Sequence, residues 1–228
     1  MFRMLIEAAV ESLDAALAAV EGGAHRLELC TDLAHGGITP DLNLLQAQLP
    51  IPVFVLVRPR AGDFVYTDSE HRTMLEQISR ARSAGAHGIV TGDLSLDRTR
   101  DLIAAARPLP VTFHRAFDVF PVRSEALERL IRLGVERVLT SGGAPTAPEG
   151  AEEIRRLVVQ AKGRIEILPG GGINPNNVAR LVQQTGVREV HFSVKDAEKV
   201  RGVIQALNGA ELGKRLPNHP APSPRRSR

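Results

Sequence analysis

The stretch GAHGIV, residues Gly85–Val90, joins the end of a helix-like segment to a short apolar run through a glycine. The same pattern recurs at Gly23–Leu29, Gly134–Leu139 and Gly186–His191. Glycine adopts the left-handed conformation that commonly ends a helix before a strand. The four glycines lie about 50 to 60 residues apart, which suits two strand–helix units in each interval rather than one. The chain therefore repeats a strand–helix unit.

The strands that this spacing requires between the glycine-marked ones are predicted from other short apolar runs. They fall at Phe2–Ile6, Val53–Val57, Val111–Phe113 and Ile165–Leu168. Eight strands alternating with eight helices predict a closed parallel sheet, the α/β (β/α)8 or TIM barrel, over residues 1–212. A doubly wound open sheet is the alternative, and the absence of Gly-x-Gly-x-x-Gly after the first strand counts against it.

Helical spacing and capping signals occur between these strands. One apolar helical face is formed by Leu13, Ala16, Leu17 and Val20. The residues TDSE, Thr67–Glu70, have the form of a capping box that starts a helix. Asn174 before Pro175 predicts an N-cap followed by proline at the first helical position.

The composition is that of a globular protein, with 43% hydrophobic and 24% charged residues. A single cysteine, Cys30, excludes an intramolecular disulfide and favours a reducing compartment. No apolar run has the length needed to span a bilayer, and Glu7, Glu11 and Asp14 occupy the region where a signal peptide would be uncharged. We expect a cytoplasmic protein without a membrane partner.

The net charge of +3 arises from the last sixteen residues, 213–228, which hold five basic and no acidic side chains. The remaining residues, 1–212, carry −2, so nucleic acid is not an expected partner. The basic, proline-rich segment is predicted to be a disordered tail, and a weak polyanion contact is the alternative.

Polar side chains gather at the carboxyl ends of the predicted strands. Because side chains alternate along a strand, the inward positions at this end are Glu28, Cys30, Arg58, His114, His191 and Ser193, and Glu7 ends the first strand. We predict proton transfer, and hence catalytic roles, for Glu7, Glu28, His114 and His191. Arg58 and Arg60 are predicted to hold an anion. Alternatively, the two glutamates neutralise these arginines in a structural network.

Two glycine-containing loops extend this predicted pocket. The run PGGGI, Pro169–Ile173, follows the seventh strand, and the amides of Gly170, Gly171 and Gly172 are candidates for binding phosphate. A tight turn explains the run equally well. Ser141, in the TSGG stretch Thr140–Gly143, adds a hydroxyl and backbone donors, unless this stretch is only a polar loop.

The sequence offers few metal ligands. Cys-x-x-Cys, His-x-His and His-Glu-x-x-His patterns are absent. Copper(I) prefers thiolate and thioether ligands, so Cys30 is the candidate ligand. A lone inward cysteine is more often a small buried apolar residue.

Several motifs together resemble the CutC family of copper homeostasis proteins. They are Arg26–Cys30 (RLELC), Gly36–Pro40 (GGITP), Arg58–Phe64 (RPRAGDF) with Tyr66, His114–Asp118 (HRAFD), Leu139–Gly142 (LTSG) and Pro169–Ile173 (PGGGI). The resemblance extends over residues 2–205 and implies a cytoplasmic (β/α)8 barrel, a homo-oligomer such as a dimer or tetramer, and a role in copper tolerance with copper(I) binding. The family's copper binding is tied to cysteines, of which Cys30 alone matches, and Leu168 stands where the family often has methionine.

Two hypotheses of different classes follow. The resemblance implies a copper homeostasis protein whose ligand is a copper(I) ion. The predicted pocket indicates an enzyme that acts by acid–base chemistry on a small anionic, for example phosphorylated, metabolite.

Overall fold

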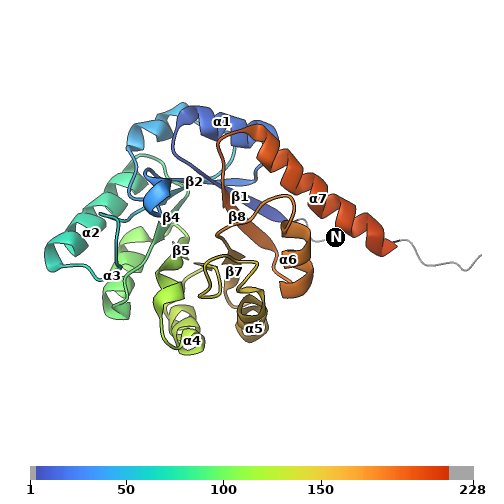
Figure 1. Ribbon diagram of the computed structural model, residues 1–228. Helices are drawn as coiled ribbons and strands as arrows, with labels where there is room; N and C mark the ends of the chain where they lie inside the picture. The colour runs from blue at the N-terminus through green and yellow to red at the C-terminus, as the bar shows by residue number, and fades with distance from the viewer. Residues whose placement is uncertain (1–3, 216–228) are drawn as a thin grey trace, which may run out of the picture.

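A barrel of eight parallel strands forms the centre of the protein (Figure 1). The computed structural model describes residues 4–215, with side chains through residue 210. The strands are β1 (Leu5–Val10), β2 (Arg26–Leu29), β3 (Val53–Leu56), β4 (Gly88–Thr91), β5 (Val111–Phe113), β6 (Arg137–Thr140), β7 (Glu166–Pro169) and β8 (Glu189–Ser193). Sequential strands pair from β1 to β7, β1 also pairs with β8, and one bridge between Gly170 and His191 joins the ends of β7 and β8. This nearly closed barrel confirms the (β/α)8 prediction and excludes the doubly wound sheet.

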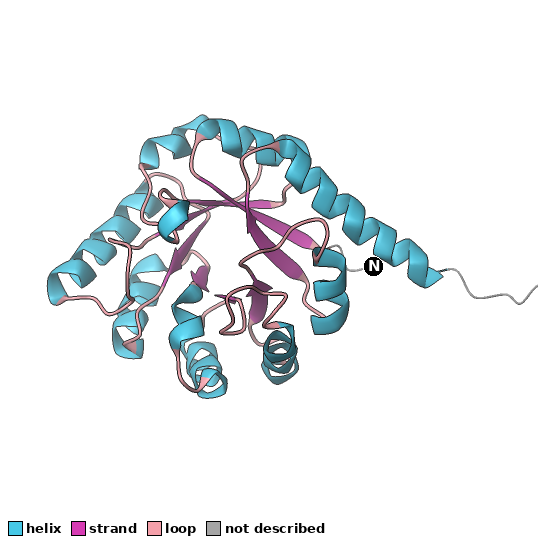
Figure 2. Cartoon of the chain, viewed as in Figure 1, coloured by secondary structure: helices cyan, strands magenta, loops and turns pink. Residues whose placement is uncertain are grey.

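Helices surround the barrel, as Figure 2 shows in cyan. The α-helices are α1 (Leu13–Gly22), α2 (Asp68–Ser83), α3 (Leu96–Ala106), α4 (Arg123–Leu133), α5 (Ala151–Ala161), α6 (Val178–Thr185) and α7 (Ala197–Arg215). Residues 4–215 contain seven α-helices, so the prediction of eight is wrong. Between β2 and β3 two short 3-10 helices, Leu33–His35 and Leu42–Ala47, replace the expected α-helix. Left-handed Gly36 and Gly37 (φ +87° and +82°) and the nearby Pro40 break this connection.

The helix ends agree in part with the sequence signals. Gly23, Gly134 and Gly186 end α1, α4 and α6 in the left-handed conformation, and Thr67 opens α2 with the predicted capping box. The proline-start prediction is wrong, because Asn174 organises a turn and α6 begins only at Val178. Residues 213–215 continue α7 instead of starting the predicted tail, and residues 216–228 lie outside the described part.

The buried face of α1 also differs from the predicted one. Ala15, Ala16 and Ala19 are buried, whereas the side chains of Leu13 and Leu17 are exposed. Small residues face inward because α1 approaches α7 closely: a Cβ added at Gly22 would lie 2.6 Å from Cβ of Val200. Within residues 4–215, no helix is both long and apolar enough to cross a membrane.

The core has two parts, as strand alternation requires. The large part lies between strands and helices and contains Leu27, Val55 and Phe113. The small part fills the barrel interior and consists of Ala9, Cys30, Phe54, Leu56 and Val90. The predicted inward and outward faces of β2, β3, β5 and β8 agree with this division.

The first strand begins and ends later than predicted. The apolar residues Ala8, Ala9 and Val10 are almost fully buried and extend the pairing with β2. Glu7 therefore lies in the middle of β1, opposite Arg26 on one side and His191 on the other, and not at the strand end. This register places the Glu7 carboxylate deeper in the barrel than expected.

Candidate functional site

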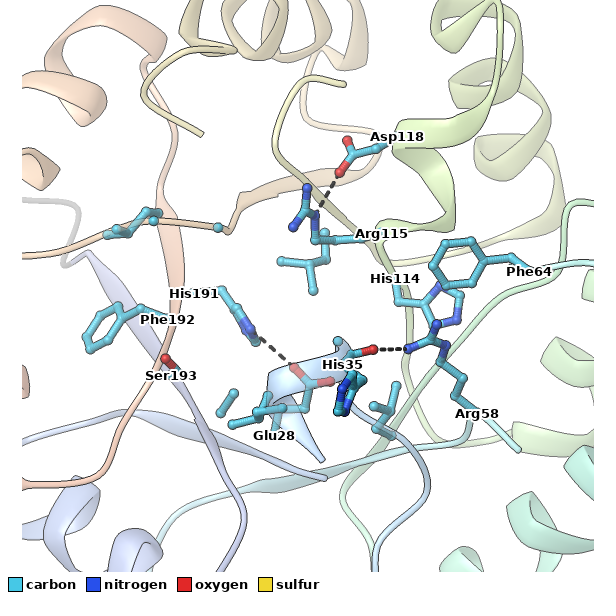
Figure 3. A pocket seen from close by; sticks show the side chains of 18 of the residues that line it. Glu28, His35, Arg58, Phe64, His114, Arg115, Asp118, His191, Phe192 and Ser193 are labelled. Atoms are coloured by element: carbon cyan, nitrogen blue, oxygen red, sulfur yellow. Dashed lines mark hydrogen bonds and ion pairs between the residues drawn. The ribbon is translucent and has the colours of Figure 1, made fainter. Parts of the chain in front are cut away.

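A cavity of about 510 Å³ opens at the carboxyl ends of the strands (Figure 3). Its polar lining comes from almost every part of the barrel: Glu28, His35, Arg58, His114, Arg115, Asp118, Gly171, Gly172, His191, Ser193 and Lys199. The cavity lies where (β/α)8 barrels place their ligand sites. The chain thus brings together Glu28, Arg58, His114, His191, Ser193, Gly171 and Gly172 from the predicted set, and leaves the other predicted residues outside the lining.

His191 sits between two carboxylates. Its Nδ1 lies 2.7 Å from Oε1 of Glu7, and its Nε2 lies 3.4 Å from Oε2 of Glu28. All three side chains are buried, but only Glu28 and His191 border the cavity (Figure 3). Glu7 therefore supports the imidazole from beneath, and the Glu28–His191 pair meets any bound molecule.

The two carboxylates have opposite pKa shifts. Burial raises the pKa of Glu28 to about 7, because the favourable charges of His191 and Arg26 only partly offset desolvation and the nearby Glu7 adds repulsion. Burial also disfavours ionised Glu7, but hydrogen bonds and charges from His191 and Arg26 outweigh it and lower the Glu7 pKa to about 2. The pKa of His191 is raised, because the charges of Glu28 and Glu7 overcome the desolvation of the imidazolium. A carboxyl group with this pKa can exchange a proton near neutral pH.

Arg26 lies at the base of this arrangement and was missed by the sequence prediction. Its guanidinium bonds Glu7 through Nε and places a second nitrogen 2.6 Å from Oε2 of Glu189. Arg137 bonds the same Glu189 oxygen at 2.9 Å, and both guanidiniums lie over the ring of Phe54. The available signal was alternation, because Arg26 precedes the inward Glu28 by two residues in β2.

The buried imidazole of His114 accepts one backbone hydrogen bond. Its Nδ1 accepts the amide of Ala116 at 3.2 Å, which puts the ring proton on Nε2. Burial and the charge of Arg58 lower the His114 pKa to about 3, so the ring stays neutral. The ring packs against Phe64, and Nε2 has no partner among the described residues.

The two predicted anion-holding arginines occupy different positions. The guanidinium of Arg58 donates to the carbonyls of Gly37 at 2.8 Å and Gly62 at 2.7 Å, so it holds two loops together at the cavity wall. Arg60 lies outside the cavity and pairs with Glu70 and Asp63 at 2.6 and 2.9 Å. The alternative in which these arginines neutralise Glu7 and Glu28 is wrong, because no such ion pair forms.

Asp118 organises the loop that follows β6. Its carboxylate accepts hydrogen bonds from the amides of Ser141 and Gly143, the hydroxyl of Thr140 and Nε of Arg115. Ser141 is fully buried and does not line the cavity. This arrangement matches the polar-loop alternative for the TSGG stretch, and sequence alternation missed Asp118 and Arg115 because they belong to a 3-10 helix.

The three glycines after β7 have different structural roles. The Gly170 amide donates to the carbonyl of Thr140. A Cβ at Gly170 would lie 2.6 Å from Cδ1 of Leu139 and 3.1 Å from Cδ2 of His191, so this glycine makes room for both side chains. Gly171 and Gly172 are left-handed (φ +99° and +74°) and line the cavity. The Gly171 amide faces β8 in the bridge between Gly170 and His191, and the Gly172 amide has no hydrogen-bond partner among the described residues.

The residues present do not suit copper(I). Cys30 is completely buried in the apolar interior, its Sγ contacts the carbonyl of Val10, and burial raises the pKa of the thiol. Ligand atoms of Glu7, Glu28 and His191 lie within 4.8 Å of one another, but they are oxygen and nitrogen donors, and Arg26 already neutralises Glu7. Copper(I) prefers sulfur ligands, so neither place fits that ion.

The fold is a (β/α)8 barrel with a cavity at its carboxyl face, lined by Glu28, His191 and several basic side chains. The CutC family model matches residues 4–196 of this chain. The chain therefore belongs to the CutC family, which confirms the resemblance carried by its motifs.

Named relatives and a solved structure agree with this assignment. The human copper homeostasis protein cutC homolog is 48% identical over 200 residues, covering 84% of this chain and 73% of the relative. A CutC family protein from Sinorhizobium medicae is 44% identical over 206 residues, covering 87% and 84%. The crystal structure of a CutC protein from Streptococcus agalactiae aligns with a TM-score of 0.79 and 34% identity, over 83% of this chain and 98% of that one.

Proposed function

We propose that this chain serves copper homeostasis, the role for which its human relative is named, through a cavity that binds a small anionic molecule and exchanges a proton with it. The observation that carries the chemical part is the Glu28–His191 pair at the cavity wall, with Glu28 titrating near neutrality. The high identity to the named relatives supports the copper part. We place this activity in the cytoplasm, where a lone thiol stays reduced.

The proposed chemistry uses the chain's own groups in separate roles. Glu28 takes up or releases the proton, because its two ionisation states have similar free energies near pH 7. His191, held by Glu7, stabilises the ionised form of Glu28. His114 donates through Nε2 to an oxygen of the bound molecule, where negative charge develops or resides.

Copper(I) cargo bound at Cys30 is the second candidate, because the family's name favours it. In this protein the thiol would have to leave an apolar interior and find a second sulfur ligand. We therefore expect any tight copper(I) binding to be independent of Cys30.

Two measurements separate these candidates. Competition with a copper(I) chelator is performed on wild type and Cys30→Ala, and thermal unfolding is followed with phosphate, sulfate or malonate at constant ionic strength. We expect unchanged copper(I) binding in Cys30→Ala and a higher unfolding temperature with at least one anion. Tight one-to-one copper(I) binding that Cys30→Ala abolishes, or no response to any of the three anions, would contradict the cavity proposal.

A further inference from the structure

The ends of β7 and β8 form one wall of the cavity. Gly170 forms a parallel bridge with His191. Gly172 and Ser193, each two residues further along the chain, continue this wall at the same height. Both line the cavity, together with Gly171 and with Lys199 from the first turn of α7. Donors from two loops and one helix therefore gather on a single wall.

Lys199 brings a positive charge to this wall without an acidic partner. Its Nζ donates to the carbonyl of Ser193 at 2.8 Å and lies 5.5 Å from the centre of the Phe192 ring. Among residues 4–210, no carboxylate lies within ion-pair distance of Nζ. Partial burial lowers the Lys199 pKa, because only Asp196 opposes the loss of hydration. An ammonium has three donors, so two remain for a ligand.

The neighbouring Gly172 adds a backbone donor. A side chain at either Gly171 or Gly172 would require a strained left-handed backbone. Gly172 is exposed and lines the cavity, so its amide is available to a bound group. The guanidinium of Arg115 lies beside Gly171, with one nitrogen 3.3 Å from the position that a Cβ would occupy there. Arg115 is paired with Asp118, so on the β7–β8 wall the charge without a carboxylate partner is that of Lys199.

An independent feature of the same cavity also points to a ligand. His114 is 4% exposed, and its Nε2 is buried without a hydrogen-bond partner among the described residues. Since Nδ1 accepts the Ala116 amide, Nε2 carries a proton that needs an acceptor. His114 follows β5 directly, away from the β7–β8 wall, so a molecule that satisfies both must extend across the cavity (Figure 3).

We infer that the β7–β8 wall binds the phosphoryl group of a small phosphorylated metabolite, with Lys199 and the amide of Gly172 donating to its oxygens. The inference rests on the proposed function, in which the cavity binds a small anion. A phosphoryl group offers three oxygens and up to two charges, which matches the several donors here better than a carboxylate does. The remaining volume and the His114 donor accommodate an oxygen-bearing carbon skeleton.

Calorimetric titration with inorganic phosphate tests the subsite. Wild type is compared with Lys199→Met and with the matched control Lys195→Met, whose lysine is exposed and does not line the cavity. We expect phosphate to bind wild type and Lys195→Met equally and to bind Lys199→Met about tenfold more weakly or worse. Lys199→Arg, which keeps the charge, is expected to recover part of the affinity.

Malonate titrations under the same conditions distinguish failure of the phosphoryl subsite from failure of the general anion-binding function. Binding of malonate without binding of phosphate overturns the phosphoryl subsite and leaves a carboxylate-binding cavity. Equal phosphate affinity in wild type and Lys199→Met also overturns the subsite. If neither anion nor sulfate binds wild type, the anion-binding function itself is wrong. Unfolding curves of each variant, recorded without ligand, verify that the compared proteins are folded.

Discussion

The imidazole of His191 and the carboxylate of Glu7 form an ion pair inside the barrel, with Nδ1 2.7 Å from Oε1. Glu7 has no solvent exposure and also bonds Arg26, so one carboxylate links two cationic groups. Such a pair fixes the ring orientation of His191 and leaves Nε2 facing Glu28. The relationship explains why a group too deep to touch a ligand belongs to the site.

Replacing Glu7 by glutamine is expected to destabilise the protein by about 3–5 kcal/mol at pH 7, because Arg26 and His191 lose a buried counter-charge. Glu76→Gln, at an exposed position, is the control. The Glu7 pKa is lowered to about 2, so its stabilisation is complete above pH 4.5 and is lost as the pH falls toward 2. Chemical denaturation of both variants measures the effect. Equal stability of Glu7→Gln and wild type at pH 7 would show that the ion pair contributes nothing.

Glu28→Gln is expected to have the opposite effect on stability. Because the Glu28 pKa is raised to about 7, the folded state keeps a proton that the unfolded state releases above pH 4.5, and stability falls as the pH rises from 4.5 to 7. Glutamine has no such proton to lose. At pH 8.5 the variant should be more stable than wild type by on the order of 1–3 kcal/mol, and at pH 4.5 this advantage should be absent. Denaturant unfolding at both pH values decides, and a variant that is less stable at pH 8.5 would contradict the assigned shift.

Much of this site follows from strand alternation alone. Glu28, Arg58, His114 and His191 occupy inward positions near the carboxyl ends of short, regular strands, where a period of two applies without correction. The helix ends at Gly23, Gly134 and Gly186 could also be predicted locally, because each needs only a left-handed backbone that glycine adopts readily.

The remaining parts depend on three-dimensional context. Lys199 and Asp118 lie on helices or turns after the strands, so no strand period could predict that they reach the cavity. Arg58 lies where alternation predicts, but its guanidinium binds the carbonyls of Gly37, 21 residues away, and of nearby Gly62, and strand alternation cannot predict these loop contacts. The depth of Glu7 depended on a strand register that is set by pairing with β2 and β8.

Cys30 is expected to react slowly with a thiol reagent in the native protein. The side chain has no exposure, and burial raises the thiol pKa, so the reactive thiolate is rare and inaccessible. Labelling with an aromatic disulfide should be at least about a hundredfold slower than in the denatured chain. Equal rates in native buffer and in denaturant would show that the thiol is accessible and would restore it as a metal ligand.

His114 is expected to remain neutral from pH 8 to pH 5, with the proton on Nε2. Its pKa is lowered to about 3, so its contribution to stability is complete above pH 6.5 and is lost as the pH falls from 6.5 toward 3. Nitrogen-15 spectra of the imidazoles provide the measurement, with His191 as an internal comparison because its pKa is raised. Titration of His114 near pH 6.5 would contradict its assignment as a neutral donor.

Asp118→Asn is expected to loosen the loop after β6 while leaving the barrel folded. The carboxylate accepts from Ser141 N at 3.1 Å, from Gly143 N at 3.1 Å and from the hydroxyl of Thr140, and an amide group offers only one oxygen for these donors. It also loses the charge that pairs with Arg115. We expect a loss of about 1–3 kcal/mol in unfolding free energy, because buried donors are left without acceptors.

Hydrogen exchange provides the more specific readout for Asp118→Asn. The Gly143 amide should exchange at least about tenfold faster than in wild type, whereas amides inside β2 and β3 should keep their protection at conditions where the fold is stable. Asp97→Asn serves as the control, because Asp97 is exposed and, among the described residues, pairs only with Arg100 in the same helix. A uniform increase across all strands would indicate global destabilisation, and unchanged Gly143 exchange would show that the Asp118 carboxylate does not hold this loop. Since Arg115 and Gly171 are neighbours, a loosened loop should also weaken phosphate binding, although Asp118→Asn leaves Lys199 in place.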